Sequence, residues 1–408
     1  MKEDFIGYYR PSEEEIQELW SNCIFIIDAN VILNLYRYPQ EARNDLLKIL
    51  NIISDRVWMP HQAALEYQEN RLAVIAEQIA KYENVRDILQ KSQSQLESQL
   101  GQLQLKKRHS RINPDRLLTQ FKSVFDEFLV ELEQLEQEQP DVFHEDPIRQ
   151  ELDKLFAGKI GSAPESQEAL NTLYDEGDAR YKAMIPPGYK DAKKEGSYSF
   201  GGLTYQTRYG DWLLWHQIIT EANKNDKFKN IIFVTDDKKD DWWWVVNSKG
   251  KKTIGPLPEL VVEIYAKAPV SLFYMYTSQR FMQFASDYLD IEVREESLRQ
   301  VHDITEFYYY GRYSDDDTGF NEFLQTLIDL GNVDDESLDI TEKVIAAGIE
   351  SLDDREMRIF KEQVLDIFTV ERCARCGNEI PWSEMYHALE NGNLCNWCWH
   401  MWEKMKSE

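Results

Sequence analysis

Acidic residues follow two apolar stretches of the chain at the point where each stretch ends. Asp28 comes directly after residues 23–27, and Asp236 and Asp237 come at the end of residues 231–235. Short apolar runs of this kind are typical of buried strands in a parallel sheet. Ligands bind at the carboxyl ends of the strands in open α/β sheets, so we expect these acids to face a ligand.

Two further acids lie near the beginnings of predicted helices. Glu66 is in the first turns of a helix that follows Pro60, and Asp211 opens a helix after Gly210. Carboxylate oxygens are the ligands that Mg²⁺ prefers, and such ions can activate a water for phosphodiester hydrolysis. A single Asp after a strand is also a common cap or turn residue. The combination of acids therefore predicts a catalytic Mg²⁺ or Mn²⁺ site.

The elements around these acids predict an α/β fold with an open parallel sheet flanked by helices. Four short apolar runs are predicted strands, the last at the edge of the sheet: residues 23–28, 56–60, 231–235 and 269–276. Residues 41–53 and 211–223 have the spacing of amphipathic helices. The β-α-β alternation favours a sheet with helices packed against it.

A long polar insertion divides the predicted sheet. Residues 62–105 lack proline and predict one long helix, and residues 116–138 resume a helical pattern after a break. Two such helices form a hairpin, which we interpret as a projecting arm. The arm is either a solvated coiled-coil spacer or a dimer interface. The basic cluster at residues 106–111, at its tip, is a candidate phosphate contact.

We expect five parts in the chain. The two halves of the α/β domain are residues 1–75 and 141–285, and the arm between them is residues 76–140. Residues 286–370 form an acidic helical connector, and residues 371–408 form a small C-terminal module. Within the second half, residues 140–210 show no clear period and are expected to be irregular.

The C-terminal module carries two CxxC pairs. Cys373 and Cys376 form the first pair, and Cys395 and Cys398 form the second. Four thiolates complete a tetrahedral Zn²⁺ site, and a site closed by four protein ligands is structural. A segment this short needs such a staple to fold by itself. We therefore expect one structural zinc, with His400 as the alternative to one cysteine.

Composition limits the classes of protein to consider. The chain has 408 residues, of which 42% are hydrophobic, and a formal net charge of −27. Nucleic-acid binders usually carry a basic surface instead, although bound cations reverse the field of a carboxylate site. The N-terminus shows no secretory signal, and no apolar run reaches the length of a membrane span. We expect a soluble cytoplasmic protein without a membrane partner.

The first two motifs around the acids resemble those of PIN-domain nucleases. The segment FIIDANVILNLY looks like the opening strand of that family, where an Asp is followed two residues later by Asn or Ser. Asp28 and Asn30 match these positions. The segment MPHQAALEYQENR resembles the proline-led second acid of the family, matched by Glu66.

The last two motifs continue the resemblance in the same order along the chain. GDWLLWHQIITEA resembles the helix-opening third acid, matched by Asp211, and IIFVTDDKKDDWWW resembles the strand with a T-x-D ending. By that spacing Asp237 is the fourth acid, with Asp236 as the alternative. The tryptophans and the stretch IPPGYKDAKK look more specifically like a bacterial PIN-like branch associated with phage defence.

The resemblance covers residues 21–75 and 170–285 and implies a Mg²⁺- or Mn²⁺-dependent cut in RNA or, less often, in single-stranded DNA. It implies that Asp28, Asp211 and Asp237 bind the metal. Glu66 would bind it too or orient the attacking water, and Asn30 would support Asp28 by a hydrogen bond. The C-terminal third is not covered, and the arm is larger than in minimal PIN domains.

Several cations are candidate contacts to nucleic acid. Four of them surround the PPGY stretch at residues 186–189 and one follows the fourth acid: Arg180, Lys190, Lys193, Lys194 and Lys239. Lysines can meet phosphates while Tyr189 and Tyr198 stack on bases. The alternative is an ordinary solvated loop. Lys238 and Lys239 either contact the scissile phosphate or only offset the nearby acids. Residues 242–244, all Trp, are expected to lie in the core or at an interface, with stacking on nucleic acid as the alternative.

Three functions fit these features. The first is a PIN-like nuclease, acting as a toxin or defence effector on nucleic acid, with RNA favoured. The second is an inactive PIN-like scaffold that recruits partners through its arm and zinc finger. The third is a phosphatase or other metal hydrolase. A regulatory protein or a second copy of the chain is a further candidate partner.

Overall fold

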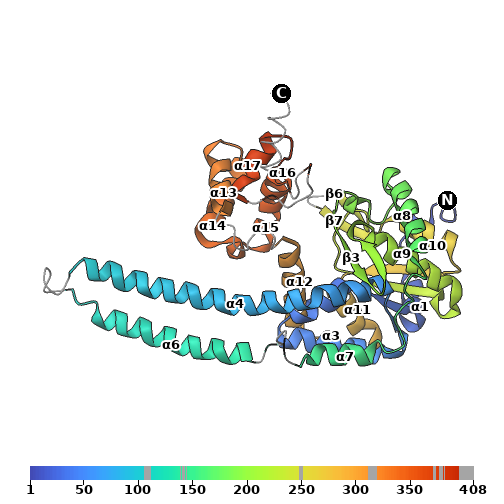
Figure 1. Ribbon diagram of the computed structural model, residues 1–408, viewed down its shortest axis with the longest axis horizontal. Coiled ribbons are helices and arrows are strands. Elements are labelled where there is room, and N and C mark those ends of the chain that lie inside the picture. The colour runs from blue at the N-terminus through green and yellow to red at the C-terminus, as the bar shows by residue number, and fades with distance from the viewer. Residues whose placement is uncertain are drawn as a thin grey trace.

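A four-stranded parallel sheet lies at the centre of the α/β domain (Figure 1). Its strands, in spatial order, are β2 (Val57–Trp58), β1 (Ile24–Ile27), β5 (Asn230–Val234) and β8 (Leu272–Tyr276). All three pairings are parallel. The four predicted strands and the edge position of the last one are confirmed.

The structure is a computed structural model of the whole chain. The residues that it describes are 1–104, 112–137, 139, 143, 145–247, 251–310, 319–370, 374–375, 380 and 382–394. Every residue of β1 and of β5 is buried. Because successive side chains of a strand point to opposite faces, this pattern means that both faces of the sheet are covered.

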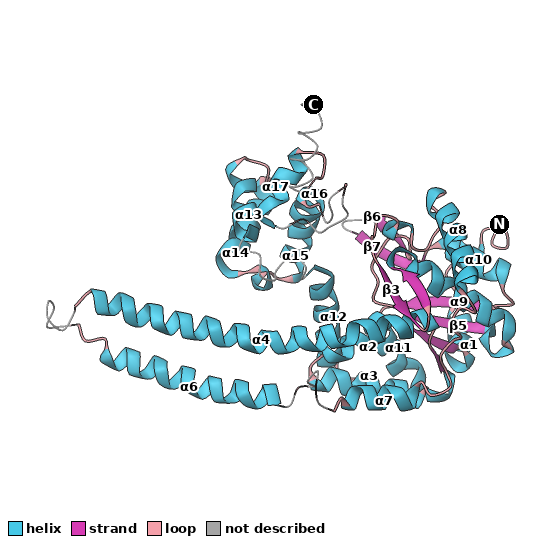
Figure 2. Cartoon of the chain, in the orientation of Figure 1, coloured by secondary structure: helices cyan, strands magenta, loops and turns pink. Residues whose placement is uncertain are grey.

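Helices and turns of the α/β domain surround the sheet. The helices are α1 (Glu13–Asn22), α2 (Ala29–Leu33), α3 (Gln40–Ile52), α7 (Pro147–Leu155), α8 (Gln167–Lys182), α9 (Gly210–Lys224), α10 (Pro258–Lys267) and α11 (Ser278–Leu289). The short 3-10 turns are η1 (Ile6–Tyr8), η2 (Asn34–Tyr36), η3 (Ser54–Arg56), η4 (Tyr189–Asp191), η5 (Thr207–Tyr209) and η6 (Asp226–Lys229). Figure 2 shows the strands confined to this domain.

Two antiparallel hairpins accompany the sheet. They are β3 (Ser197–Phe200) with β4 (Leu203–Gln206), and β6 (Trp243–Asn247) with β7 (Lys251–Pro256). The expectation that residues 140–210 are irregular is wrong, because α7, α8 and the first hairpin lie there. The buried residues of α8 are Leu170, Tyr174, Gly177, Arg180 and Tyr181. Their spacing has a helical period, but tyrosine and glycine weaken the apolar pattern.

The arm consists of α4 (His61–Gln102) and α6 (Asp115–Gln137), which run side by side away from the domain (Figure 1). The first turns of α4 belong to the core, since Ala63 and Leu65 are buried. An ion pair of 2.7 Å between Arg71 and Asp146 holds the base of the arm. Residues 106–111 at the tip lie outside the described residues, so their predicted phosphate contact stays a prediction.

A second hydrophobic core lies in the C-terminal region. Its elements follow α12 (Glu295–Tyr310) and are α13 (Gly319–Asp329), α14 (Asp335–Ala347), η8 (Ile349–Ser351), α15 (Asp354–Phe360), a π-helical turn (Lys361–Leu365), α16 (Asp366–Phe368) and α17 (Trp382–Glu390). Trp382 of α17 packs against Phe320 and Phe323 of α13. The boundary that we drew at residue 370 therefore falls inside one core.

Two expectations about the chain meet the structure differently. The four cysteines of the predicted zinc site, Cys373, Cys376, Cys395 and Cys398, lie outside the described residues. No helix in the described part of the chain is both long enough and apolar enough to cross a bilayer.

Candidate active site

The carboxyl ends of β1 and β5 bring Asp28 and Thr235 together. The two strands pair in register, with Ile27 beside Val234, so the residues that follow them are neighbours. The backbone N–H of Asp28 donates to the carbonyl of Val234 at 3.0 Å. The Thr235 hydroxyl donates to Oδ2 of Asp28 at 2.6 Å.

Asp28 is a buried carboxylate that begins a helix. Its Oδ1 accepts the N–H of Ala29 at 2.7 Å, so the side chain caps α2. Oδ2 also accepts Nδ2 of Asn30 at 2.9 Å, which is the support expected of that residue. Burial first, and then the negative charges of Asp211 and Asp237, raise the pKa of Asp28 to about 7.

Three carboxylates converge on the ammonium of Lys239. Its Nζ lies 2.7 Å from Oδ2 of Asp211, 2.9 Å from Oδ2 of Asp237 and 2.9 Å from Oδ2 of Asp191. The Lys239 side chain is only 24% exposed. A cation therefore already sits among acids that come from α9, from the loop after β5 and from η4.

The lysine and the acids change one another's protonation. Burial alone would raise the pKa of Asp211, but the Lys239 ammonium outweighs it and leaves that pKa below its ordinary value. Burial would lower the pKa of Lys239, but Asp211, Asp237 and Asp191 hold it well above its ordinary value. Lys239 thus carries its charge at neutral pH and matches one of the two roles left open for it, offsetting the acids.

Glu66 lies in the second turn of α4, near the other acids. Loss of hydration, which is the largest cause, and the negative charges of Asp28 and Asp211 raise the pKa of Glu66 to about 8. The Glu66 side chain is exposed to solvent. The solvent around this side chain reduces the effect of burial, so repulsion by the negative charges of Asp28 and Asp211 is the main reason that the charged form of Glu66 is disfavoured. A carboxylate with a pKa near neutrality can take up or release a proton at physiological pH.

Asp236 is turned away from this cluster. Its oxygens accept the N–H and the hydroxyl of Ser278 at 2.8 and 2.6 Å, and Nδ2 of Asn34 at 3.0 Å. These bonds tie the loop after β5 to the start of α11. The alternative assignment of Asp236 as a metal ligand is therefore wrong, and Asp237 is the acid that faces the cluster.

Two acids of the site were missed in the sequence. Asp191 ends η4 and contacts Lys239, and Asp241 is fully buried and accepts the N–H groups of Gly188 and Lys190 at 2.9 and 3.2 Å. Asp191 lies in the stretch IPPGYKDAKK, which drew notice only for its lysines. Burial and the charge of Asp211 raise the pKa of Asp241 to about 6.

Gly188 packs against the site. Its φ is +94°, a backbone conformation that residues with a Cβ atom rarely adopt. A Cβ at this position would lie 2.4 Å from the Tyr181 hydroxyl oxygen and 3.1 Å from Cβ of Asp211. The glycine thus lets the η4 loop approach α9 closely enough for Asp191 and Asp211 to share one lysine.

Arg180 is a structural residue rather than a nucleic-acid contact, which corrects our expectation. It is 6% exposed, and its guanidinium pairs with both carboxylate oxygens of Glu263 at 2.5 and 2.8 Å. The guanidinium also lies over the ring of Trp212, 4.2 Å from the centroid. A side chain engaged on all these sides cannot reach a phosphate.

The other candidate lysines lie nearer the surface. Lys193 is exposed. Lys194 pairs with Asp191 at 2.7 Å, and Lys190 pairs with Asp240 at 2.8 Å, so these two are held beside the acid cluster. The site therefore has a cationic border next to its acids.

The aromatic residues near the site mainly support it. Trp242 is buried, as expected, and its indole N–H donates to Oδ2 of Asp211 at 3.3 Å. The indole of Trp243 donates to the carbonyl of Asp237 at 2.5 Å. The ring of Tyr198 stacks on Tyr205, with 5.5 Å between centroids, which leaves it less free to stack on a base than expected.

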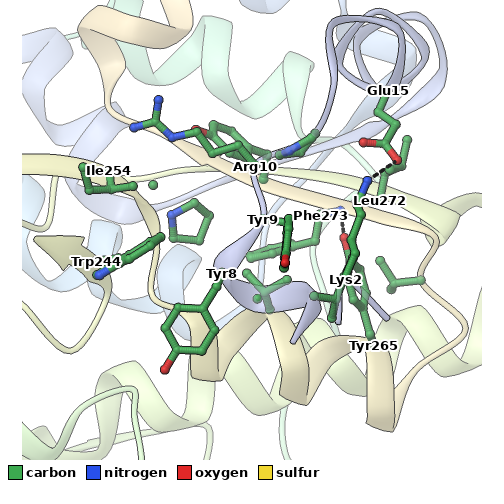
Figure 3. Close-up of a pocket in the computed structure, with 18 of the residues that line it drawn as sticks. Lys2, Tyr8, Tyr9, Arg10, Glu15, Trp244, Ile254, Tyr265, Leu272 and Phe273 are labelled. Carbon is green, nitrogen blue, oxygen red and sulfur yellow. Dashed lines mark hydrogen bonds and ion pairs between the residues drawn. The ribbon is translucent and has the colours of Figure 1, made fainter. Parts of the chain in front are cut away.

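A cavity of about 240 Å³ lies elsewhere, between the N-terminal segment and the β6–β7 hairpin (Figure 3). Its walls include Tyr8, Arg10, Trp244 and Tyr265. None of the acids described above lines it. The proposed metal ligands and this cavity are therefore separate features of the domain.

No group of three His, Cys, Asp or Glu side chains in the described part of the chain forms a ready metal site. The donor set nevertheless suits a hard cation, because all the candidate ligands are carboxylate oxygens. The Lys239 ammonium occupies the place that such a cation would take. The residues present fit Mg²⁺ or Mn²⁺ once Lys239 withdraws.

The fold and the cluster define a class of protein: an α/β domain that gathers acids at the carboxyl edge of a parallel sheet. The family profile described as PIN like domain matches residues 24–260, more than half of the 408 residues, and the chain belongs to this family. No curated protein and no solved structure shows significant similarity to the chain.

Proposed function

We propose that this chain is a metal-dependent nuclease that hydrolyses phosphodiester bonds, in RNA rather than in single-stranded DNA. The observation that carries the proposal is the convergence of Asp191, Asp211 and Asp237 on one cation, within 2.9 Å. Membership of the PIN-like family supports it. We further propose that the protein is cytoplasmic and acts as a toxin or phage-defence effector.

Asp28, Asp211 and Asp237 are the residues that would hold Mg²⁺ or Mn²⁺. The metal, when bound, supplies charge stabilisation and an activated water at the phosphodiester. Thr235 and Asn30 orient Asp28 for this role through their hydrogen bonds. Hydrogen bonds of this kind to a metal-binding carboxylate fix the orientation of its oxygens.

Glu66 would bind the metal or orient the attacking water and take its proton. Its pKa of about 8 suits proton transfer near neutral pH. Lys193 is exposed and lies two residues after Asp191 in the chain, so we propose that it meets the phosphates of a strand. Lys190 and Lys194 would have to exchange an Asp partner for a phosphate to join it.

One observation favours a second function, that of an inactive scaffold. Lys239 fills the space among the acids and neutralises part of their charge. A protein that no longer needs a metal could keep its fold in this way. In that case the arm and the C-terminal region would recruit partners, and added metal would change neither stability nor activity.

Cleavage assays separate these functions. The full chain is incubated with labelled single-stranded RNA, single-stranded DNA, duplex DNA and transfer RNA, with Mg²⁺ or Mn²⁺ or with a chelator. We expect RNA cleavage that requires metal and is lost in Asp28→Asn. Asp240→Asn is the control for loss of one carboxylate near the site, because Asp240 lies in the loop that carries Asp237 but is exposed and pairs with Lys190 instead of the cluster.

Three outcomes would reject the nuclease. They are no cleavage of any substrate with either metal, cleavage that survives the chelator, and normal cleavage by Asp28→Asn. Hydrolysis of p-nitrophenyl phosphate without cleavage of nucleic acid would indicate a phosphatase instead.

We also propose one structural Zn²⁺ on Cys373, Cys376, Cys395 and Cys398, supported by their CxxC spacing. Elemental analysis of the purified chain should give one zinc per chain. The Cys373→Ser/Cys376→Ser variant should lose it. A zinc-free wild-type chain, purified without chelator, would contradict the proposal.

A further inference from the structure

Helix α6 carries two apolar stripes on different faces. Its less exposed face contains Phe125, Leu129 and Leu132, and α4 is the element with which α6 makes extended contact in the described part of the chain. This first stripe therefore packs within the arm. A groove whose walls include Ile79, Leu129 and several polar side chains, such as Arg86 and Glu136, remains between the two helices.

The second stripe is exposed, although the ring of Phe121 also touches Phe125 of the first stripe at 5.8 Å between centroids. It consists of Leu117, Phe121, Val124, Phe128 and Leu135. Val124 is 61% exposed and Phe121 is 42% exposed. Figure 1 shows α6 on the outer side of the arm. Contiguous apolar surface of this kind marks an interaction site.

The spacing of the stripe identifies the type of partner. Its positions are separated by four, three, four and seven residues, which is the heptad pattern of a helix that packs against another helix. Glu131 occupies the remaining heptad position. The stripe runs for about 27 Å along the helix, at 1.5 Å per residue. The partner is therefore an apolar helix of similar length.

The charges on α6 favour a second copy of the same helix in the opposite direction. Its N-terminal half carries Arg116 and Lys122 together with Asp115. Its C-terminal half carries acids alone, and of these Glu136 already pairs with Arg86 within the arm, which leaves Glu127, Glu131 and Glu133 for a second copy. Parallel pairing would place like charges together. Antiparallel pairing places the basic half of one helix beside the acidic half of the other, which is stabilising.

We propose that two copies of this chain associate through the exposed stripes of α6, in antiparallel orientation, so that the two arms form a four-helix bundle. In this register Leu117 of one copy lies level with Leu135 of the other, and Val124 with Phe128. The two-fold symmetry makes the same patch serve both copies. The proposal does not depend on the nuclease activity.

Light scattering on the full chain tests the association. The wild type should have about twice the monomer mass of 48.2 kDa. Phe121→Glu/Phe128→Glu should halve that mass and leave the circular dichroism spectrum unchanged, because both rings are exposed. Thr119→Glu, exposed on another face of α6, is the control and should remain a dimer. A monomeric wild type, or a dimer unaffected by the double variant, would overturn the proposal.

Cross-linking tests the orientation. Leu117→Cys/Leu135→Cys should form a disulfide-linked dimer under mild oxidation, and each single variant should not. The two positions are about 27 Å apart in one helix, so they cannot link within a chain. Self-linking of the Leu117→Cys single variant would indicate parallel pairing and would refute the antiparallel dimer.

Discussion

The hydroxyl of Thr235 donates a hydrogen bond of 2.6 Å to Oδ2 of Asp28, and it also accepts the N–H of Asp237 at 3.1 Å. One buried hydroxyl thus joins the acids that follow the two central strands. The bond favours the charged form of Asp28 and lowers its pKa, but burial outweighs the bond and leaves that pKa raised to about 7.

Thr235→Val should move the pH dependence of the nuclease to higher pH. A hydrogen bond to a charged group contributes about 1.5–3 kcal/mol, or roughly one to two pKa units. Metal-supported cleavage at pH 7 should fall about tenfold and recover in alkaline buffer. Rate profiles against pH measure the shift, and Thr235→Ser should behave as wild type. An unshifted profile for the valine variant would show that this bond does not set the protonation of Asp28.

Lys239→Met should make the metal bind more tightly and the metal-free protein less stable. Removing the ammonium leaves Asp191, Asp211 and Asp237 facing one another without a cation. Breaking a buried ion pair costs about 3–5 kcal/mol, and partial exposure of Lys239 places the loss at the lower end. Thermal unfolding in a Mn²⁺ titration measures both effects, with exposed Lys193→Met as control. Unchanged Mn²⁺ dependence would exclude competition between lysine and metal.

Asp28 should make the metal-free protein less stable as the pH rises. The pKa of Asp28 is about 7 in the folded chain, against roughly 3.9 for an unfolded Asp. The folded state therefore holds an extra proton between these values, and stability falls as the pH rises through that window, by up to ~4 kcal/mol. The difference in unfolding free energy between wild type and Asp28→Asn, followed from pH 4 to pH 8 without metal, isolates this contribution. A constant difference would contradict the raised pKa.

Gly188→Ala should reduce activity more than a comparable glycine substitution elsewhere. The added Cβ would displace Tyr181 or the backbone near Asp211, in addition to about 1–3 kcal/mol of backbone strain. Gly201 also has a positive φ, but a Cβ there meets nothing within 4 Å. Gly201→Ala is therefore the control for strain alone. Equal cleavage rates in both variants would show that the approach of the η4 loop does not position Asp211.

Lys193 and Arg180 should respond in opposite ways to replacement by alanine. Lys193→Ala should weaken RNA binding and reduce the salt dependence of the affinity by about one unit of slope, with stability nearly unchanged. Arg180→Ala should destabilise the fold by about 1.5–3 kcal/mol, because it removes charged hydrogen bonds to Glu263, whose carboxylate keeps Lys267 and Trp215 as partners. Salt titrations of binding and chemical unfolding distinguish the two. Weaker RNA binding by a folded Arg180→Ala protein would restore Arg180 as a contact residue.

The sheet could be predicted from the sequence because its strands carry strong local patterns. Residues 23–27 and 231–235 are continuously apolar, as strands covered on both faces must be. The α8 helix could not be recognised in the same way, since tyrosines and a glycine form its buried face. Packing among aromatic rings, such as Tyr174 on Tyr209 at 4.7 Å between centroids, is a tertiary property that no local period reveals.

The acids of the site were predictable in kind and only partly in detail. Asp236 and Asp237 are adjacent in sequence, and what separates their roles is the start of α11, where Ser278 binds Asp236. Asp191 follows no strand and opens no long helix, so only the folded loop brings it to Lys239. Arg180 has the sequence context of a surface cation, and only the folded chain brings Glu263, which is distant in sequence, into an ion pair with it.

The order of the strands also governs when the catalytic centre can first exist. The central strand β1 lies between β2 and β5, and β5 follows the whole arm and the first hairpin in the chain, so it is synthesised after both. A growing polypeptide that ends before residue 237 holds Asp28 and Glu66 but lacks the last acid. The proposed nuclease site therefore cannot assemble until residue 237 has been synthesised, because its acids come from segments on both sides of the arm.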